Sequence, residues 1–383
     1  MITITNKENC CGCNACLQSC PTECIEMEED KEGFLYPNVN ISLCIDCNRC
    51  EKVCPVINQG QSRLPLMVYA AKNKNNKIRL QSTSGGAFSS IAEYVLSNEG
   101  IVFGAKYDKD WNVVHDYITD ISDLSLFYGS KYVESKIGRS YETVQLFLKS
   151  GKLVLFTGTP CQIAGLNTFL RKPFENLITV DIICHGVPSS KIWSKYLKAR
   201  QNGNLQNIVC ISFRNKDFGW SSSSFKILTN DNSDSCIKEP SGTSLFLKGF
   251  YRHLYLRPSC HSCPSKSLKS QSDITIGDFW GISSFHSEFN DEKGVSLVLV
   301  NSKKGEQIFN ILNLDIISSE YKIALAKNPS IEQSCLPNKN RDKFFNELNS
   351  LDIITLLNKY TKPSFKERGR SFLRKITSCL LEK

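Results

Sequence analysis

The chain has 383 residues, of which 41% are hydrophobic and 18 are cysteines, and its formal net charge is +9. This length predicts two to three domains with a buried core. No apolar run approaches the ~18 residues that a membrane span requires. Basic residues gather in residues 362–383 rather than on a folded face, so nucleic acid is not expected as the main partner.

Two cysteine runs between residues 10 and 55 share the spacing C-x2-C-x2-C-x3-C-P. In bacterial ferredoxins this spacing places three thiolates on one cubane cluster, and the fourth, before proline, ligates the other cluster. We therefore predict two [4Fe-4S] clusters with crossed ligands. Cluster I would be held by Cys10, Cys13, Cys16 and Cys54, and cluster II by Cys44, Cys47, Cys50 and Cys20.

Zinc and disulfides are the alternatives for these cysteines. Zinc sites use paired C-x2-C hairpins rather than triplets with a C-x3-C-P tail. A disulfide framework would require a secreted chain, and the sequence shows no signal peptide. We expect a reducing, cytoplasmic location. Cys11 and Cys24 lie outside the spacing and are interpreted as packing residues, although ligation by Cys11 is a less favoured alternative.

The predicted elements begin with a strand over residues 1–8 and a strand–turn–strand unit over 24–39. Residues 57–65 have the composition of a linker. Strands are then expected at 67–72, 100–105, 113–119, 152–157 and 177–183, and helices at 87–96, 141–149, 162–170 and 192–199. This alternation predicts α/β units with parallel pairing. Antiparallel strands at 208–214 and 223–229, a helix at 245–255, strands at 273–281 and 295–300, and a helical stretch over 302–357 follow.

Four further cysteines could share one site. Cys161 and Cys184 each follow a predicted strand, and the helix between those strands forms a right-handed crossover that brings both strand ends to one edge of the sheet. Ligands bind at that edge in open α/β sheets. Cys260 and Cys263 form a C-x2-C pair before another strand. Core packing, a zinc site and a redox dithiol remain alternatives to a third iron–sulfur cluster.

Several segments in this region resemble one known family. They are S-T-S-G-G-A-F (82–88), G-S-K-Y-V-E-S (129–135), F-T-G-T-P-C-Q (156–162), I-C-H-G-V-P (183–188), C-H-S-C (260–263) and D-I-T-I-G-D-F-W-G (273–281). In this order they resemble the family of coenzyme F420 hydrogenase/dehydrogenase beta subunits over most of residues 67–285. The resemblance implies FAD and a [4Fe-4S] cluster beside it, held here by Cys161, Cys184, Cys260 and Cys263.

FAD needs a cradle for its phosphates and a surface for its ring. Ser84, Gly85 and Gly86 open a helix, whose free N–H groups can face a phosphate. Lys131 would add a positive charge. Thr157, Gly158 and Thr159, with Gly277 and Asp278, lie at strand ends where the backbone could approach the ring. The alternative is that Gly-Gly is a turn and Thr-Gly-Thr a helix cap.

The fold class expected from these patterns is α+β: a small bacterial-ferredoxin-like domain (1–60), a mixed α/β flavin-binding domain (66–300) and a helical C-terminal region (301–383) with a basic tail. The leading hypothesis is an FAD- and [4Fe-4S]-dependent oxidoreductase that exchanges electrons with a ferredoxin or another redox partner and with a small organic substrate. The alternative is a non-catalytic electron-transfer subunit. Residues 362–383 could contact a membrane surface or a protein, His185 is a candidate proton donor, and no catalytic residue is assigned.

Overall fold

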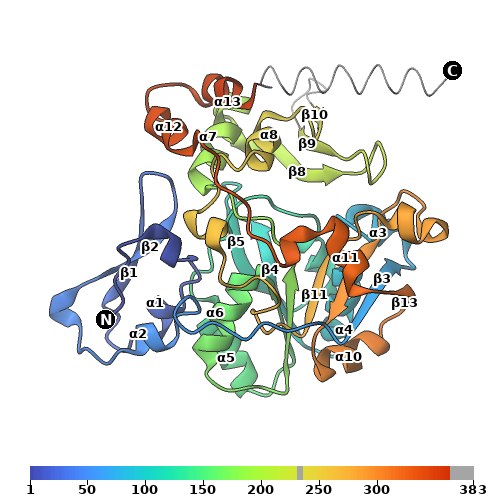
Figure 1. The fold of residues 1–383 in the computed structure, drawn as a ribbon, viewed down its shortest axis with the longest axis horizontal. Helices are drawn as coiled ribbons and strands as arrows, with labels where there is room; N and C mark the ends of the chain where they lie inside the picture. Colours follow the sequence, from blue (N-terminus) through green and yellow to red (C-terminus); the bar gives the residue numbers. More distant parts are fainter. Residues whose placement is uncertain (231–235, 363–383) are drawn as a thin grey trace.

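The computed structural model describes residues 1–230 and 236–362 (Figure 1). The N-terminal part contains two short helices, α1 (Ala15–Ser19) and α2 (Arg49–Lys52), and an antiparallel hairpin of β1 (Ile25–Glu29) and β2 (Leu35–Val39). The hairpin confirms the strand–turn–strand prediction. The strand predicted over residues 1–8 is wrong. The Asn6 side chain accepts a hydrogen bond from the Glu8 N–H and caps a 3-10 turn, η1 (Lys7–Asn9), so the chain bends there instead of extending.

A mixed sheet of eight strands forms the centre of the molecule, in the order β13-β3-β12-β11-β7-β6-β4-β5. Strands β4, β6, β7 and β11 are parallel neighbours, whereas β5, β12, β3 and β13 pair antiparallel. The parallel pairing was therefore predicted correctly for the middle of the sheet only. The strands are β3 (Met67–Asn73), β4 (Ile101–Tyr107), β5 (Val113–Ile118), β6 (Val154–Gly158), β7 (Leu177–Ile182), β11 (Ile274–Asp278), β12 (Ser296–Val300) and β13 (Leu314–Ser319).

Helices α4 (Ala87–Ser97), α5 (Ser140–Lys149) and α6 (Pro160–Leu170) agree with the predicted positions and pack on this sheet (Figure 1). Their apolar side chains fill its core. Phe103 and Phe156 on neighbouring parallel strands are buried, and Tyr141 of α5 packs against Phe156. Burial of such aromatic side chains stabilises the layer strongly, since each removes a large apolar area from water.

A second layer lies against one edge of the sheet (Figure 1). It holds the antiparallel strands β8 (Ile208–Asn215), β9 (Ser224–Thr229) and β10 (Ile237–Pro240), with the helices α7 (Ser190–Arg200), α8 (Leu245–Tyr251), α12 (Arg341–Glu347) and α13 (Ile353–Thr361). Its core is a buried aromatic cluster around Trp193, Phe213 and Phe246. The helix predicted to reach residue 255 ends at Tyr251, because His253 adopts a left-handed φ of 57° that a helix does not accommodate.

The stretch over 302–357 is helical in most parts but not throughout. Helices α10 (Lys303–Asn310) and α11 (Tyr321–Lys327) flank β13, which pairs with β3 and was not predicted. Without β13, the side of β3 that faces away from β12 would expose a row of unpaired backbone N–H and C=O groups. Pairing with β13 satisfies these groups. The remaining short helices are α3 (Asn76–Gln81) and α9 (Ile282–Phe285).

Among residues 1–230 and 236–362, no helix combines the length and the apolar character needed to cross a bilayer. Apart from Lys362, the predicted basic tail over 362–383 lies outside the described residues. Its suggested contact with a membrane surface or a protein stays a prediction.

Candidate iron–sulfur centres

The cysteines assigned to cluster I lie together between α1 and α2. Cys16 is near Cys10 and Cys54, and burial together with these two neighbours raises the pKa of its thiol to about 12. Cys13 is near Cys16 and Cys54. Three of the four cysteines are buried, and Cys10 is partly exposed. The fold therefore brings the four thiols of the predicted set close to one another, and thiols are the donors that a cubane cluster uses. Their assignment to one cluster stays a prediction, since Cys50 is also a neighbour of Cys16 and Cys54.

The cysteines assigned to cluster II line one small cavity. Cys20, Cys44, Cys47 and Cys50 border it, and Cys24 lies beside them with its Sγ 3.4 Å from the Sγ of Cys20. The N–H of Ile2 donates to the Sγ of Cys50 over 3.3 Å. Cys47 is exposed, and Cys20 and Cys44 are partly exposed. This centre is consequently closer to solvent than cluster I.

The other four cysteines converge at the carboxyl edge of the sheet. Cys161 is in the first turn of α6 directly after β6, Cys184 follows β7, and Cys260 lies in the 3-10 helix η5 (Pro258–Ser262). Cys260 has Cys184, Cys263 and Cys161 as neighbours, and burial is the main reason that its thiol pKa is raised. The Val187 N–H also donates to the Cys260 Sγ over 3.4 Å. Four thiols from three separate segments thus meet at one place.

In the described part of the chain, no three His, Cys, Asp or Glu side chains are close enough to ligate a single metal ion. The ligands of a cube bind four different corners and stand farther apart than those around one ion. The convergence of four thiols therefore fits a third [4Fe-4S] cluster, whose existence stays a prediction.

Cys11 packs between two of these cysteine sets, in agreement with its interpretation as a packing residue. Its side chain contacts those of Cys13 and Cys161, so it lies between the ligands of cluster I and the third cysteine set. The side chain is 8% exposed. The packing role was predicted from the sequence, but no sequence pattern indicates that Cys161, 150 positions away, is the neighbour of Cys11.

The residues predicted to bind FAD collect at the same sheet edge. The Ser84 hydroxyl lies 3.4 Å from the Gly277 carbonyl and donates to the Val295 carbonyl over 2.6 Å. The N–H groups of Gly85 and Ala87 donate to the Ser296 hydroxyl, so these two amides are not free for a phosphate. A Cβ at Gly85 would lie 2.2 Å from the Ala71 carbonyl, so close packing against β3 explains this glycine.

The other predicted FAD contacts are also engaged within the chain. Lys131 donates to the carbonyls of Leu126 and Tyr128, and burial lowers its pKa to about 7. Asp278 pairs with Arg214 over 3.3 Å and accepts from the Trp220 indole over 3.0 Å. At the end of β6, the Thr157 hydroxyl donates to the Phe103 carbonyl. Gly158 packs on the Gln162 side chain, and Thr159 caps α6. The phosphate-binding role therefore stays a prediction.

Two comparisons with known families agree with this arrangement. Residues 9–58 match the model of the 4Fe-4S dicluster domain. Residues 151–320 match the model that describes the C-terminal part of the beta subunit of coenzyme F420 hydrogenase/dehydrogenase. Residues 151–320 are therefore similar to the C-terminal part of the coenzyme F420 hydrogenase/dehydrogenase beta subunit. The region similar to the beta subunit follows the region similar to the dicluster domain, in the order that the sequence predicted.

Individual relatives match different parts of this chain. The F subunit of the F(420)H(2) dehydrogenase of Methanosarcina mazei is 22% identical over 348 residues, which is 86% of this chain and 88% of the relative. The ferredoxin 7Fe of Hydrogenibacillus schlegelii is 43% identical over 51 residues, 13% of this chain and 59% of the relative. A chain of the F420-reducing [NiFe] hydrogenase complex from Methanosarcina barkeri matches with a TM-score of 0.48 and 17% identity, over 75% of this chain and 94% of that chain.

Burial lowers the pKa of two histidines near the predicted cofactor residues. Burial, together with His253 and Lys266, lowers the pKa of His185 to about 4, and its Nε2 lies 2.8 Å from that of His253. His115 is buried, and its Nε2 lies 2.6 Å from the Thr157 carbonyl, so this nitrogen carries the proton. Burial lowers the pKa of His115 to about 4.

His115 should make the fold sensitive to acid. The unfolded chain binds a proton at this residue near pH 6.5, whereas the folded chain does so only near pH 4. Stability is therefore complete above about pH 6.5 and falls as the pH drops towards 4. Between pH 7 and 5 we expect the wild type to lose about 2 kcal/mol more unfolding free energy than His115→Gln, in anaerobic urea titrations. Equal losses in both proteins would contradict this role.

Proposed function

We propose that the chain is an iron–sulfur flavoprotein oxidoreductase with three [4Fe-4S] clusters. Electrons would enter at cluster II, pass through cluster I to the third cluster, and leave for a two-electron organic substrate, or travel in the reverse direction. The observation that carries the proposal is the contact of Cys11 with both Cys13 and Cys161. It leaves one intervening side chain between the ligand sets of cluster I and the third cluster.

The exposure of the cysteines supports the proposed direction of entry. Cluster II has an exposed ligand, Cys47, and lies nearest to solvent, where a ferredoxin or another redox partner could dock. The ligands of cluster I are more buried. The third set lies at the carboxyl edge of the sheet, where open α/β sheets bind their ligands.

FAD belongs to the same proposal, because a four-iron cluster passes single electrons and many organic reductions need two. A bound flavin stores two electrons and releases them singly or as hydride. The side chains next to β11 offer aromatic and donor groups for such a role. The indole rings of Trp220 and Trp280 stack with their centroids 5.2 Å apart, and within the described residues the Nε of Arg214 is buried without a hydrogen-bond partner. The engaged N–H groups of Gly85 and Ala87 mean that no step is assigned to the Ser84–Gly86 turn.

The name of one relative favours a second function. The protein from Methanosarcina mazei is named as a subunit. By analogy, this chain would be a non-catalytic relay that connects a partner enzyme to the ferredoxin pool. A cytoplasmic location is part of both proposals.

An anaerobic experiment separates the two functions. The full chain is purified anaerobically and its flavin and iron are quantified. It is then mixed with reduced coenzyme F420 as the donor and benzyl viologen as the acceptor. Steady turnover of the purified chain, with extractable FAD, supports the oxidoreductase. Dithionite bleaching without turnover of any offered small molecule, and without flavin, contradicts it and favours the relay.

A further inference from the structure

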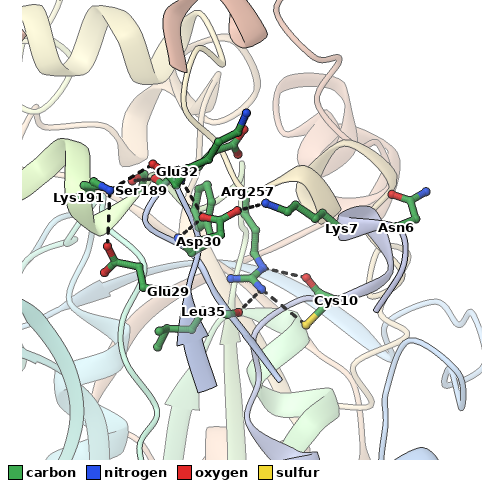
Figure 2. Close-up of polar contacts among 12 residues, drawn as sticks. Asn6, Lys7, Cys10, Glu29, Asp30, Glu32, Leu35, Ser189, Lys191 and Arg257 are labelled. Carbon is green, nitrogen blue, oxygen red and sulfur yellow. Dashed lines mark hydrogen bonds and ion pairs between the residues drawn. The ribbon is translucent and has the colours of Figure 1, made fainter. Parts of the chain in front are cut away.

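A buried arginine connects the cluster I cysteines with the loop that carries the third cysteine set. The Arg257 side chain is 0% exposed. Its Nε donates to the Cys10 carbonyl over 2.8 Å, and its Nη2 lies 3.6 Å from the Cys10 Sγ (Figure 2). Nη2 also donates to the Leu35 carbonyl of β2 over 2.7 Å. The guanidinium group is therefore fixed against one cluster I ligand by several hydrogen bonds.

The backbone of the same residue is fixed to the other centre. The Arg257 N–H donates to the Val187 carbonyl over 2.9 Å, and its own carbonyl accepts from the Cys260 N–H over 3.0 Å. Its side chain stacks on Tyr36, with the guanidinium carbon 4.6 Å from the ring centroid. These contacts hold the head group and its charge beside Cys10.

Glu134 is the counter-charge of this arginine. Its carboxylate accepts from the Nη1 of Arg257 over 2.8 Å, and its side chain is 15% exposed. The pair is nearly neutral as a whole, but the arginine is the member that contacts Cys10. The field at cluster I therefore depends on both charges, with opposite signs.

We propose that Arg257 raises the reduction potential of cluster I and that Glu134 partly offsets this effect. Adding an electron makes a thiolate-ligated cluster more negative. A positive charge and an N–H donor at a ligating sulfur stabilise that reduced form. Burial acts in the opposite direction, because charge is costly in a low dielectric. Arg257 thus compensates for the deeper position of cluster I, and this inference rests on the proposed function in which cluster I is the middle member of the relay.

Cluster II provides the contrast within the same chain. Its ligands are more exposed, and the basic residue at its cavity, Arg49, is itself exposed. An exposed charge is screened by water and salt and shifts a potential less than a buried one. Changes at Arg257 should therefore move the potential of cluster I and leave that of cluster II in place.

The test is an anaerobic redox titration of the full chain, followed by electron paramagnetic resonance. The cluster I signal is assigned as the one that Cys16→Ala removes. Glu134→Gln keeps the shape of the acceptor but removes its charge, so cluster I should be reduced more easily than in the wild type. Glu134→Gln/Arg257→Met leaves no unpaired buried charge. Relative to Glu134→Gln, the double variant should lower the equilibrium constant for reducing cluster I at least tenfold. This corresponds to a midpoint potential lower by at least 59 mV for one electron.

The proposal is supported if the cluster I midpoint potential rises from wild type to Glu134→Gln and falls from Glu134→Gln to the double variant, while the cluster II midpoint potential is unchanged. Equal cluster I midpoints in the two variants, or an equal shift of cluster II, would overturn it. If the double variant fails to retain iron, Glu134→Gln alone tests the proposal. A cluster I midpoint potential in Glu134→Gln that is no higher than in the wild type would then overturn it. Loss of the third cluster would contradict the relay but would not affect this comparison, so the two proposals fail separately.

Discussion

Replacing Cys184 with alanine is expected to lower the iron content from about twelve atoms per chain to about eight, while the two ferredoxin-type clusters remain. The reason is the separation of the ligand sets. Cys184 lies with Cys161, Cys260 and Cys263 at the sheet edge, whereas the other eight ligands are all in the N-terminal part. A cube that loses one of four protein ligands is expected to be lost as a unit. Iron and acid-labile sulfide analysis of anaerobically purified protein measures the effect.

Cys210→Ala is the matched control for this experiment. Cys210 is an exposed cysteine on β8, outside all three ligand sets, so its replacement should leave the iron content unchanged. About twelve iron atoms in Cys184→Ala, or about eight in the wild type, would contradict the third cluster. Stoichiometric zinc in place of iron would contradict all three.

Removing the Glu32 carboxylate is expected to destabilise the protein by about 3–5 kcal/mol, which is the usual cost of leaving a buried charge without its partner. Glu32 lies in the turn between β1 and β2, and its two oxygens accept from Arg341 of α12 over 3.0 and 2.5 Å. The two side chains are 9% and 10% exposed. The pair thus fixes the hairpin of the N-terminal part to the second layer, and anaerobic urea unfolding of Glu32→Gln measures its contribution.

Two variants show whether the charge pair itself is responsible. Glu306→Gln breaks the ion pair with Lys303, whose side chain is 82% exposed, and should cost at most ~1 kcal/mol. Glu32→Leu/Arg341→Met leaves no unpaired charge and should be more stable than Glu32→Gln. If Glu32→Gln is no less stable than Glu306→Gln, the buried pair does not hold the hairpin.

The short-range patterns predicted correctly where a dicluster iron–sulfur domain lies. The C-x2-C-x2-C-x3-C-P runs indicated it, because the geometry of a cube fixes this spacing locally. The alternation of strands and helices predicted that Cys161 and Cys184 would end neighbouring parallel strands, as the β6–β7 pairing confirms. In both cases, backbone geometry over a few residues or one crossover determines the outcome.

Long-range contacts could not be predicted in the same way. The strand β13 depends on the open edge of β3, more than 200 positions earlier. The position of Cys11 beside Cys161 and that of Arg257 beside Cys10 depend on how the N-terminal part docks on the sheet. A charged residue such as Arg257 carries no sequence signal for full burial, because most arginines are exposed.

The most direct test of the three-cluster relay is spin-quantified electron paramagnetic resonance of the anaerobically purified chain, fully reduced with a strong low-potential donor. The relay predicts about three reduced-cluster spins per chain, with spin–spin broadening that Cys184→Ala simplifies to the two-cluster pattern. About two spins in the wild type, with the same spectrum in Cys184→Ala, would contradict it.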